Sequence, residues 1–231
     1  MRFEKKFTFS LTELDEVRDL ILTSNLAFKK VYTDRFINSL YLDTYNLDNY
    51  EDNLAGLSNR SKARIRWYSK SANEPFSLAK SLTFEIKLRS NAIGKKLSHI
   101  INFKNKNLLI AKNNQKLMKQ IRELVPKSFL PYIDGYSEFS LLSSYNREYF
   151  EDQTGQFRIT LDSSLTFSKV NLMANSSNFN LEKISTNYGV LEVKLPLSFE
   201  KKIYEFEKNI RLLRPGRHSK YAVGINLIYN N

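Results

Sequence analysis

The clearest strand signal in this sequence is the stretch Arg60-Ser-Lys-Ala-Arg-Ile-Arg-Trp-Tyr68. A strand turns successive side chains to opposite faces, so the four cations share one face, while Ala63, Ile65 and Trp67 share the other. Cations cannot enter an apolar core without a large loss of solvation free energy. The cationic face therefore meets bulk water or lines a wet site that holds anions, and this segment alone leaves both interpretations open.

Composition limits the class of protein. The 231 residues are 42% hydrophobic and include 13 Tyr and 16 Phe, which is typical of a globular chain with a sizeable core. With only 7 Gly and 5 Pro, long linkers are not expected, and we predict a single domain over residues 1–231. The absence of Cys excludes disulfides, thiolate metal sites and a cysteine nucleophile, and it fits a cytoplasmic location.

Charge and hydropathy indicate the kind of partner. No window reaches the roughly 18 apolar residues of a membrane span. The net charge of +12 indicates an anionic partner, for which nucleic acid, a membrane surface and phosphate-rich small molecules are the candidates.

The alternation recurs along the chain. It predicts strands over 2–9, 36–43, 60–68, 82–89, 95–100, 137–150, 157–162 and 190–195. Helices are predicted over 11–23, 46–54, 106–124, 199–213 and 219–229. Ser10, followed three residues later by Glu13, predicts a capping box at the start of the first helix.

The polar faces of these strands carry mostly Arg, Lys and Glu. Their members are Glu4, Lys6, Lys62, Arg64, Arg66, Glu85, Lys87, Arg89, Arg147, Arg158, Asp162, Glu192 and Lys194. Helices between the strands can cover the opposite, apolar faces from outside. We therefore predict an α+β fold in which a closed antiparallel β-barrel, with helices packed outside, surrounds a wet and charged lumen. A polyanion would relieve the repulsion among these cations, and the few carboxylates could hold a divalent cation.

Eight short motifs occur in one order along the chain. They are Glu4-Lys-Lys6, Ser39-Leu-Tyr-Leu-Asp-Thr44, Asn59-Arg-Ser-Lys-Ala-Arg-Ile-Arg-Trp-Tyr68, Phe84-Glu-Ile-Lys87, Tyr145-Asn-Arg147, Arg158-Ile-Thr-Leu-Asp162, Leu191-Glu-Val-Lys194 and Ser219-Lys-Tyr221. Together they closely resemble the catalytic domain of the vacuolar transporter chaperone (VTC) family of polyphosphate polymerases. That family belongs to the triphosphate tunnel metalloenzymes, whose fold is a closed antiparallel barrel. The resemblance runs from about residue 2 to residue 224.

The resemblance implies synthesis of inorganic polyphosphate from ATP, with release of ADP and with Mn²⁺ or Mg²⁺ as cofactor. The matching phosphate-binding cations, to which it assigns catalysis, are Lys6, Arg64, Arg66, Lys87, Arg147 and Arg158. Either Lys95 or Lys96 matches a further cation, Arg217 and Lys220 match a basic pair that contacts the chain, and Lys62 and Lys194 are added as substrate-binding cations of the same faces. Glu192 matches the metal-binding glutamate, with Glu4 and Glu85 as further metal-associated carboxylates. We expect Asp162 to be structural and to orient Arg158.

Two alternatives remain at this point. A tripolyphosphate or nucleoside triphosphate hydrolase would use the same residues with water as the nucleophile, and a non-catalytic module would bind polyphosphate without turnover. Nucleic acid is not expected as a partner, because carboxylates share the faces of the cations. ATP and polyphosphate are the expected ligands, and export of the polymer would require a separate membrane partner protein. The oligomeric state is not predicted.

Overall fold

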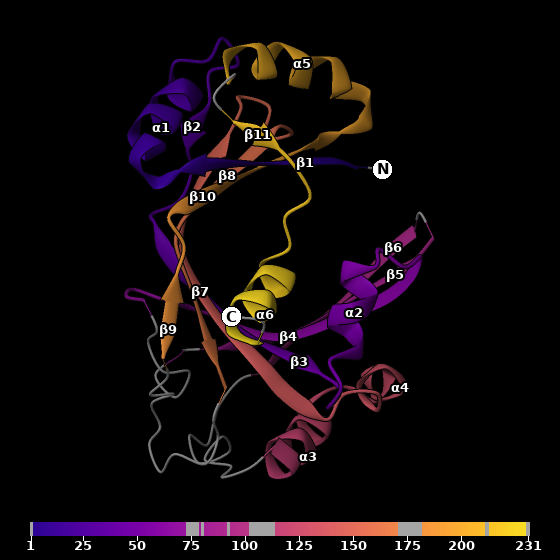
Figure 1. The fold of residues 1–231 in the computed structure, drawn as a ribbon. Helices are drawn as coiled ribbons and strands as arrows, with labels where there is room; N and C mark the ends of the chain where they lie inside the picture. Colours follow the sequence, from indigo (N-terminus) through magenta and orange to yellow (C-terminus); the bar gives the residue numbers. More distant parts are fainter. Residues whose placement is uncertain are drawn as a thin grey trace. The chain divides into compact units, whose positions relative to one another are not determined.

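The computed structural model describes residues 2–72, 79, 81–91, 93–101, 114–170, 182–210 and 213–229 (Figure 1). The strands are β1 (Arg2–Ser10), β2 (Lys29–Lys30), β3 (Arg35–Asp43), β4 (Asn59–Ser69), β5 (Leu82–Ser90), β6 (Ile93–Ile101), β7 (Glu138–Glu151), β8 (Arg158–Lys169), β9 (Lys183–Ser185), β10 (Tyr188–Pro196) and β11 (Arg214–Pro215). The helices are α1 (Leu14–Leu22), α2 (Asp48–Leu54), α3 (Asn114–Leu124), α4 (Leu130–Ile133), α5 (Glu200–Asn209) and α6 (Lys220–Tyr229).

Every predicted strand and helix has a counterpart in the structure. The predicted capping box is present, with Ser10 N donating to Glu13 Oε2 at 2.9 Å, although the first turn is a 3-10 helix. The strand predicted to end at residue 162 continues to Lys169, and the short elements β2, β9, β11 and α4 were not predicted. The first part of the helix predicted over 106–124 lies outside the described residues. None of the described helices is both long and apolar enough to cross a bilayer.

The strands pair along an open path and not around a ring. Their order is β11-β1-β10-β8-β7-β3-β4-β5-β6, with β2 and β9 attached to β7 and β8. Within the described part of the chain, no pairing joins β6 back to the β11 end. The predicted closed β-barrel is therefore wrong, and so is the enclosed lumen that depended on it. Alternation along a strand reports which face is polar, whereas closure requires hydrogen bonds between edge strands that alternation does not specify.

The chain divides into two compact units, which we describe separately. Unit 1 contains Met1–Phe36, Tyr145–Thr166 and Ser185–Ser219, and unit 2 contains Ile37–Ser144, Phe167–Ile184 and Lys220–Asn231. Strands β7 and β8 contribute residues to both. The single domain expected over residues 1–231 stays a prediction.

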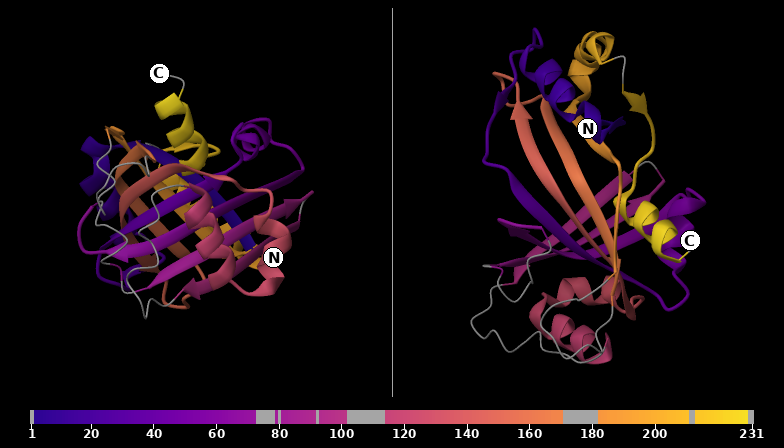
Figure 2. Two further views of the ribbon diagram at one scale, coloured as in Figure 1. Left: turned by 90° about the horizontal axis from the view of Figure 1, so that it is seen from below. Right: turned by 60° about the vertical axis from the view of Figure 1, so that its left-hand side comes forward.

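In unit 1, α1 and α5 lie on one side of β1, β8 and β10 (Figures 1 and 2). Val17 and Ile21 of α1 and Phe206 of α5 pack into a core with the apolar faces of the strands, represented by Phe7 and Leu191. This arrangement follows from the alternation, because the helices bury the apolar face and leave the charged face of the same strands on the other side.

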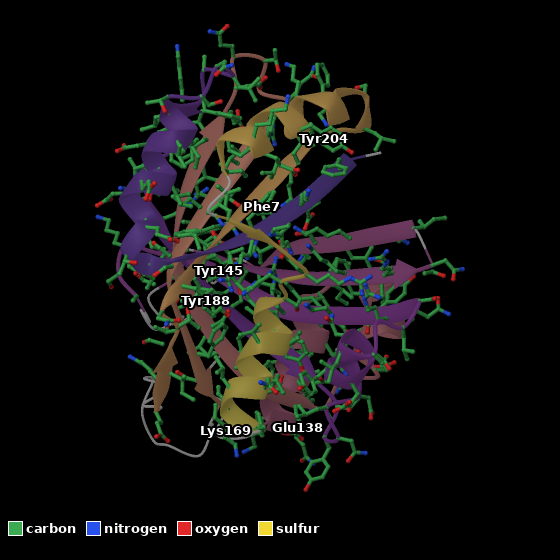
Figure 3. The ribbon with its side chains drawn as sticks, turned by 45° about the horizontal axis from the view of Figure 1, so that its top comes forward. Phe7, Glu138, Tyr145, Lys169, Tyr188 and Tyr204 are labelled. Atoms are coloured by element: carbon green, nitrogen blue, oxygen red, sulfur yellow. The ribbon has the colours of Figure 1, made fainter. Side chains whose placement is uncertain are left out.

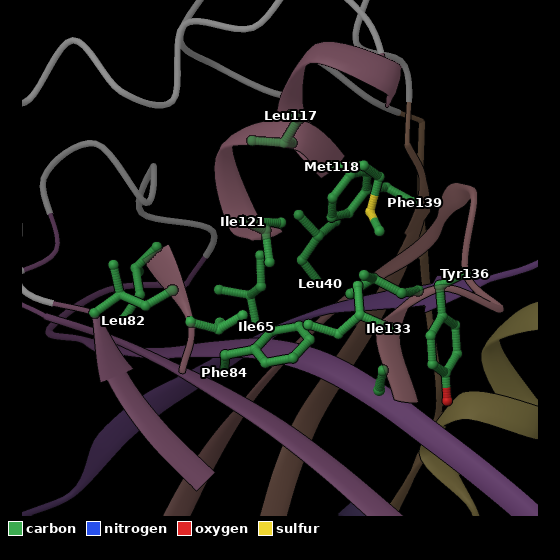
Figure 4. Packing of buried hydrophobic residues seen from close by; sticks show 14 of the residues in the cluster. Leu40, Ile65, Leu82, Phe84, Leu117, Met118, Ile121, Ile133, Tyr136 and Phe139 are labelled. Atoms are coloured by element: carbon green, nitrogen blue, oxygen red, sulfur yellow. The ribbon is translucent and has the colours of Figure 1, made fainter. Parts of the chain in front are cut away.

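In unit 2, α3 covers the apolar faces of β4 and β5 (Figures 2 and 4). Leu117 and Ile121 of α3 pack with Ile65 of β4 and Phe84 of β5, all of them buried. The α6 helix lies on the other side of these strands (Figure 1). The prediction that the helices pack outside, on the apolar faces, is therefore wrong for α6, which begins within the motif Ser219-Lys-Tyr221 and lies on the polar side.

Candidate functional site

Strand β4 brings two arginines against one buried carboxylate in unit 2. Glu85 on β5 lies opposite Arg64 in the antiparallel register, and its side chain is 5% exposed. It accepts hydrogen bonds from Arg64 Nε at 2.8 Å and Nη2 at 2.6 Å, and from Lys96 Nζ on β6 at 2.5 Å. Arg66 Nη1 lies 3.8 Å from the same carboxylate. We call Arg64, Arg66, Glu85 and Lys96 the β4 cluster; its three cations share one anion.

The β4 cluster has an excess of positive charge at neutral pH. Burial raises the pKa of Glu85, but the charges of Arg64 and Arg66, with hydrogen bonds from Lys96 and Arg64, outweigh it and lower the pKa to about 2. The carboxylate is therefore ionised and still outnumbered. Arg66 Nε is buried and has no hydrogen-bond partner among the described residues. An oxyanion at this face would supply both the missing acceptor and the missing negative charge.

Tyr41 is a buried tyrosine beside these cations that the sequence reasoning did not select. It lies on β3, the neighbour of β4 in the sheet, and it is 2% exposed. Burial raises the pKa of the phenol, but the charges of Arg64, Lys62 and Arg66, with a hydrogen bond from Arg64, lower it to about 8. The available signal was its phase, since Ser39, Tyr41 and Asp43 share a face of the strand.

The α6 helix supports this face of unit 2 from the Ser219-Lys-Tyr221 motif. The Tyr221 ring lies 5.0 Å from the Tyr41 ring, and Lys62 Nζ lies 5.5 Å from the Tyr221 ring centroid. The Tyr221 hydroxyl donates to the carboxylate of Asp43, which is fully buried and also accepts from the backbone N–H of Asn49 at 2.9 Å. The buried Asp43 carboxylate thus fixes the hydroxyl of Tyr221. The ring of Tyr221 in turn holds Lys62 on the polar face through the cation–π contact.

The other predicted cations of unit 2 are placed differently. Lys87 is exposed on β5 and lies between Lys62 and Lys96 in the pairing register. Lys95 Nζ lies 5.9 Å from an aromatic ring of α4, on the face of β6 opposite to Lys96. Of the two alternatives that the sequence left open, the structure places Lys96 in the β4 cluster. Lys220 is half-buried at the first position of α6.

Unit 1 contains a second cluster, centred on Glu192 of β10. Lys194 Nζ lies 2.8 Å from Glu192 Oε1, and Arg147 Nη2 of β7 lies 3.8 Å from Glu192 Oε2. Lys6 of β1 is the register partner of Glu192 and lies 3.3 Å from the carboxylate of Glu4. We call Glu4, Lys6, Arg147, Glu192 and Lys194 the β10 cluster. All five are among the predicted site residues.

Electrostatics keep Glu192 ionised although its side chain is only 11% exposed. Burial raises the pKa of Glu192, but the charges of Lys194, Lys6 and Arg147 outweigh it and hold the pKa well below its ordinary value. In the antiparallel register Glu4 lies opposite Lys194 and Glu192 lies opposite Lys6, so the two glutamates are diagonal neighbours on one face of β1 and β10. Thr160, the register partner of Glu192 on β8, has a buried Oγ1 without a hydrogen-bond partner among the described residues.

Arg147 is oriented by a carboxylate that was expected to orient a different arginine. Asp162 is fully buried and binds Arg147 with both oxygens, at 2.5 Å from Nε and 2.7 Å from Nη2. Burial lowers the pKa of Arg147, but the Asp162 charge outweighs it and holds the pKa well above its ordinary value. Arg158 is 51% exposed and pairs with Glu151 at 3.1 Å. The expectation that Asp162 orients Arg158 is therefore wrong, although the two side chains share a strand face.

Two further residues of unit 1 contact the β10 cluster or its neighbours without having been predicted. Lys6 Nζ donates to the backbone oxygen of His218 at 3.1 Å, and His218 Nε2 lies 3.3 Å from the Tyr188 hydroxyl. Figure 3 marks Tyr188 and Tyr145 on the strands of unit 1. Arg217, predicted to contact substrate, is exposed in the segment before α6.

The described side chains offer only small groups of ligands for a divalent metal ion. The described residues contain no group of three or more His, Cys, Asp or Glu side chains placed to hold a metal ion. The Glu4–Glu192 pair is the set that brings two predicted metal carboxylates together within unit 1. Glu85 is surrounded by three cations of the β4 cluster and is a poorer donor, because those cations already occupy its oxygens.

Fold and clusters together define an antiparallel-sheet protein with basic and acidic side chains gathered on polar strand faces. The VTC domain family matches residues 1–229, and the chain belongs to this family, which confirms the predicted resemblance. The Hippeastrum protein HpAC1, described as an adenylyl cyclase candidate with a dominant triphosphatase activity, has 16% identity and a TM-score of 0.58, covering 96% of this chain and 94% of that one. The PH1819 protein of Pyrococcus horikoshii OT3 has 12% identity and a TM-score of 0.50, covering 96% and 97%. These likenesses show a shared fold. A sequence comparison with curated proteins gives no match.

Proposed function

We propose that this protein is a polyphosphate polymerase that transfers the γ-phosphoryl group of ATP to phosphate or to a growing polyphosphate chain. The observation that carries the proposal is the β4 cluster, in which three cations face one carboxylate and Arg66 Nε has no acceptor among the described residues. Membership of the VTC domain family supports the same substrate class. The proposal does not require a closed barrel.

Phosphoryl transfer requires little covalent participation by protein side chains. A terminal oxygen of the acceptor forms a bond to the γ-phosphorus, while the bond from that phosphorus to the bridging oxygen breaks and ADP leaves with the electron pair. The acceptor oxygen is already ionised at neutral pH, so no strong general base is needed. The protein supplies positioning and neutralisation of charge on the transferring group.

The described side chains divide these tasks by their chemistry. Arg64 and Arg66 present planar guanidinium groups, which bind phosphate oxygens in pairs, while Lys96 and Lys6 act as compact point charges. Asp162 holds Arg147 in one orientation through two hydrogen bonds, so this arginine keeps its charge and its geometry. Tyr41 accepts from Arg64 and restricts that guanidinium from the β3 side.

A divalent metal is compatible with the β10 cluster. Mg²⁺ and Mn²⁺ prefer oxygen ligands, and Mg²⁺ is commonly held by one or two carboxylates, with water and substrate phosphates completing the shell. Glu4 and Glu192 would hold it, and the bound ion would neutralise charge on the phosphate oxygens. The adjacent Thr160 hydroxyl, which lacks a partner among the described residues, is available to a water or phosphate oxygen there.

Hydrolysis is the second candidate function. It is supported by the likeness in fold to the Hippeastrum protein, which is described as having a dominant triphosphatase activity. The same cations would bind a triphosphate, with water replacing the phosphate acceptor. Product analysis separates the two candidates, because a polymerase yields ADP and long chains, whereas a hydrolase yields orthophosphate.

The test is incubation of the full chain with ATP and Mn²⁺, followed by sizing of acid-labile polymer on a gel. A ladder of long chains is expected. Arg66→Ala should abolish the ladder, while Arg122→Ala, which alters a half-buried α3 arginine paired with Asp134 at 3.5 Å, should leave it unchanged. Release of orthophosphate without any polymer would contradict the polymerase and support the hydrolase. Binding of tripolyphosphate without any turnover would leave a polyphosphate-binding module.

A further inference from the structure

A stack of alternating tyrosine and arginine side chains extends from Arg147 in unit 1. The Arg147 guanidinium carbon lies 5.2 Å from the Tyr145 ring centroid and 5.9 Å from the Tyr149 ring centroid. Arg35, the first residue of β3, lies 4.9 Å from the Tyr149 ring and 5.6 Å from the Tyr32 ring. Each arginine therefore contacts two tyrosine rings, and both arginines contact Tyr149.

The stack runs from a buried end to an exposed end. Tyr145 is 2% exposed, Tyr149 and Arg35 are half-buried, and Tyr32 is 55% exposed. The Tyr32 ring meets the edge of the Tyr149 ring at 5.4 Å and an interplanar angle of 83°. Arg35 and Tyr149 thus hold Tyr32 in place from two sides while much of its side chain stays accessible to solvent.

Two carboxylates of the neighbouring segments, Asp34 and Glu148, are bound by cations. Lys30 of β2 is bound by Asp34 at 2.7 Å and by Glu148 at 3.0 Å, and Glu148 is also bound by Arg18 at 2.8 Å. These carboxylates are engaged by ammonium and guanidinium groups of their own. The exposed end of the stack combines the Tyr32 ring with the guanidinium group of Arg35, and nucleobases stack on aromatic rings and on arginine.

The position of the stack connects it to phosphate binding. Arg147 belongs to the β10 cluster, and it shares the Tyr149 ring with Arg35. A nucleoside triphosphate carries its base and its phosphates at opposite ends of one short molecule. A phosphate group held by Arg147 would place the rest of that molecule within reach of the exposed end of the stack.

We propose that Tyr32 and Arg35 form a stacking platform for the base of a nucleoside triphosphate, and so determine that the phosphoryl donor is a nucleotide and not inorganic tripolyphosphate. This inference rests on the proposed function, since it names the donor class of the same site. Base stacking is tolerant of sequence, because every base has a π-face, so we expect ATP, GTP and UTP to use the platform alike.

The test compares two ligands that share a triphosphate but differ in the base. Isothermal titration of the full chain with a non-hydrolysable ATP analogue and, separately, with tripolyphosphate measures each affinity without turnover. Tyr32→Ala should weaken binding of the ATP analogue by about 5- to 140-fold, the range of one base–aromatic stack, and should change tripolyphosphate binding less than about twofold. Tyr32→Trp should retain the affinity of the wild-type protein for the analogue.

Tyr204→Ala provides a matched control, because Tyr204 on α5 of unit 1 is 57% exposed and lies outside the stack. It should bind both ligands as the wild-type protein does. Arg35→Lys keeps the charge but removes the planar group, so it should weaken the analogue more than tripolyphosphate. If Tyr32→Ala does not fold, Tyr32→Trp and Arg35→Lys still decide the outcome.

The proposed platform would be contradicted if Tyr32→Ala weakened the binding of both ligands equally, or if it left the binding of the ATP analogue unchanged. This outcome is distinct from failure of the proposed function. If the protein binds the analogue through Tyr32 but makes no polymer, the platform is supported and the polymerase is contradicted. If Tyr32→Ala makes polymer as well as the wild-type protein does at limiting ATP, the polymerase is supported and the platform is contradicted.

Discussion

Replacement of Glu85 by glutamine is the sharpest test of the charge balance in the β4 cluster. The substitution keeps the size of the side chain and removes the anion that three cations share. Lowering the pKa of this carboxyl from its ordinary 4.5 to about 2 corresponds to about 3 kcal/mol of folding free energy. Loss of one partner from a buried ion pair costs a similar amount. We therefore expect Glu85→Gln to be less stable than the wild-type protein by about 3 kcal/mol at pH 7.

The same pKa gives the sign of the acid response. The pKa of Glu85 is lower in the folded state than in the unfolded state, so its contribution to stability is complete above about pH 4.5. That contribution is lost as the pH falls through about 2. The Glu85→Gln variant should lack this part of the acid dependence, and its deficit relative to the wild-type protein should disappear at the lowest pH.

Bound polyanion should compensate for the missing carboxylate. If the cations of the β4 cluster bind phosphate oxygens, tripolyphosphate restores negative charge beside them in the variant. It should therefore raise the stability of Glu85→Gln by more than it raises that of the wild-type protein. Urea unfolding measures this stability. Tryptophan fluorescence can follow it, because Trp67 of β4 is the one Trp of the chain.

The expected shift is large enough to measure. With a denaturant slope of about 2–3 kcal/mol/M, the urea midpoint should fall by about 1 M without ligand. Glu123→Gln, which alters an exposed glutamate of α3, should leave the midpoint unchanged. An unchanged midpoint for Glu85→Gln, or equal stabilisation of variant and wild-type protein by tripolyphosphate, would refute the reasoning.

Three further perturbations test other parts of the structure. Glu192→Gln should abolish turnover and spare most of the affinity for tripolyphosphate, measured by titration calorimetry; undiminished polymer synthesis would contradict the metal assignment. Tyr41→Phe should remove a tyrosine that ionises near pH 8 in the ultraviolet difference spectrum, and tripolyphosphate should move this ionisation to higher pH in the wild-type protein, because it offsets the cations that lower the pKa. Gly189→Ala should destabilise the protein by about 1–3 kcal/mol in urea unfolding, since the new methyl group meets an aromatic ring and the Asp162 backbone oxygen at 2.8 Å. Gly135→Ala, where no described atom lies within 4 Å of the new methyl group, is its control, and equal stability of the two variants would show that the space at Gly189 adapts.

Local structure was largely predictable because its causes are local. Alternation identified β1, β4 and β5, and the pair Ser10 and Glu13 identified the start of the first helical segment. A two-residue period reports the burial of one strand face whatever the strand pairs with. The very short strands escaped prediction because two or three residues carry no period.

The members of the two clusters were also largely predictable, but their partners were not. Ten predicted site residues gather in the clusters or beside them: Lys62, Arg64, Arg66, Glu85 and Lys96 in unit 2, and Glu4, Lys6, Arg147, Glu192 and Lys194 in unit 1. Tyr41 was overlooked because its phase shows only which face of the strand it occupies, and not that cations of the neighbouring strand lie beside it.

Sequence alone determined which side chains share a strand face, and hence that cations and carboxylates gather on the polar side of the sheet. Tertiary structure alone decided that Asp162 binds Arg147 and not Arg158, that Lys96 and not Lys95 reaches Glu85, and that the strand path stays open. The physical reason is that phase follows from backbone geometry within one strand. Register, side-chain rotamers and edge pairing depend on residues that are distant in the chain.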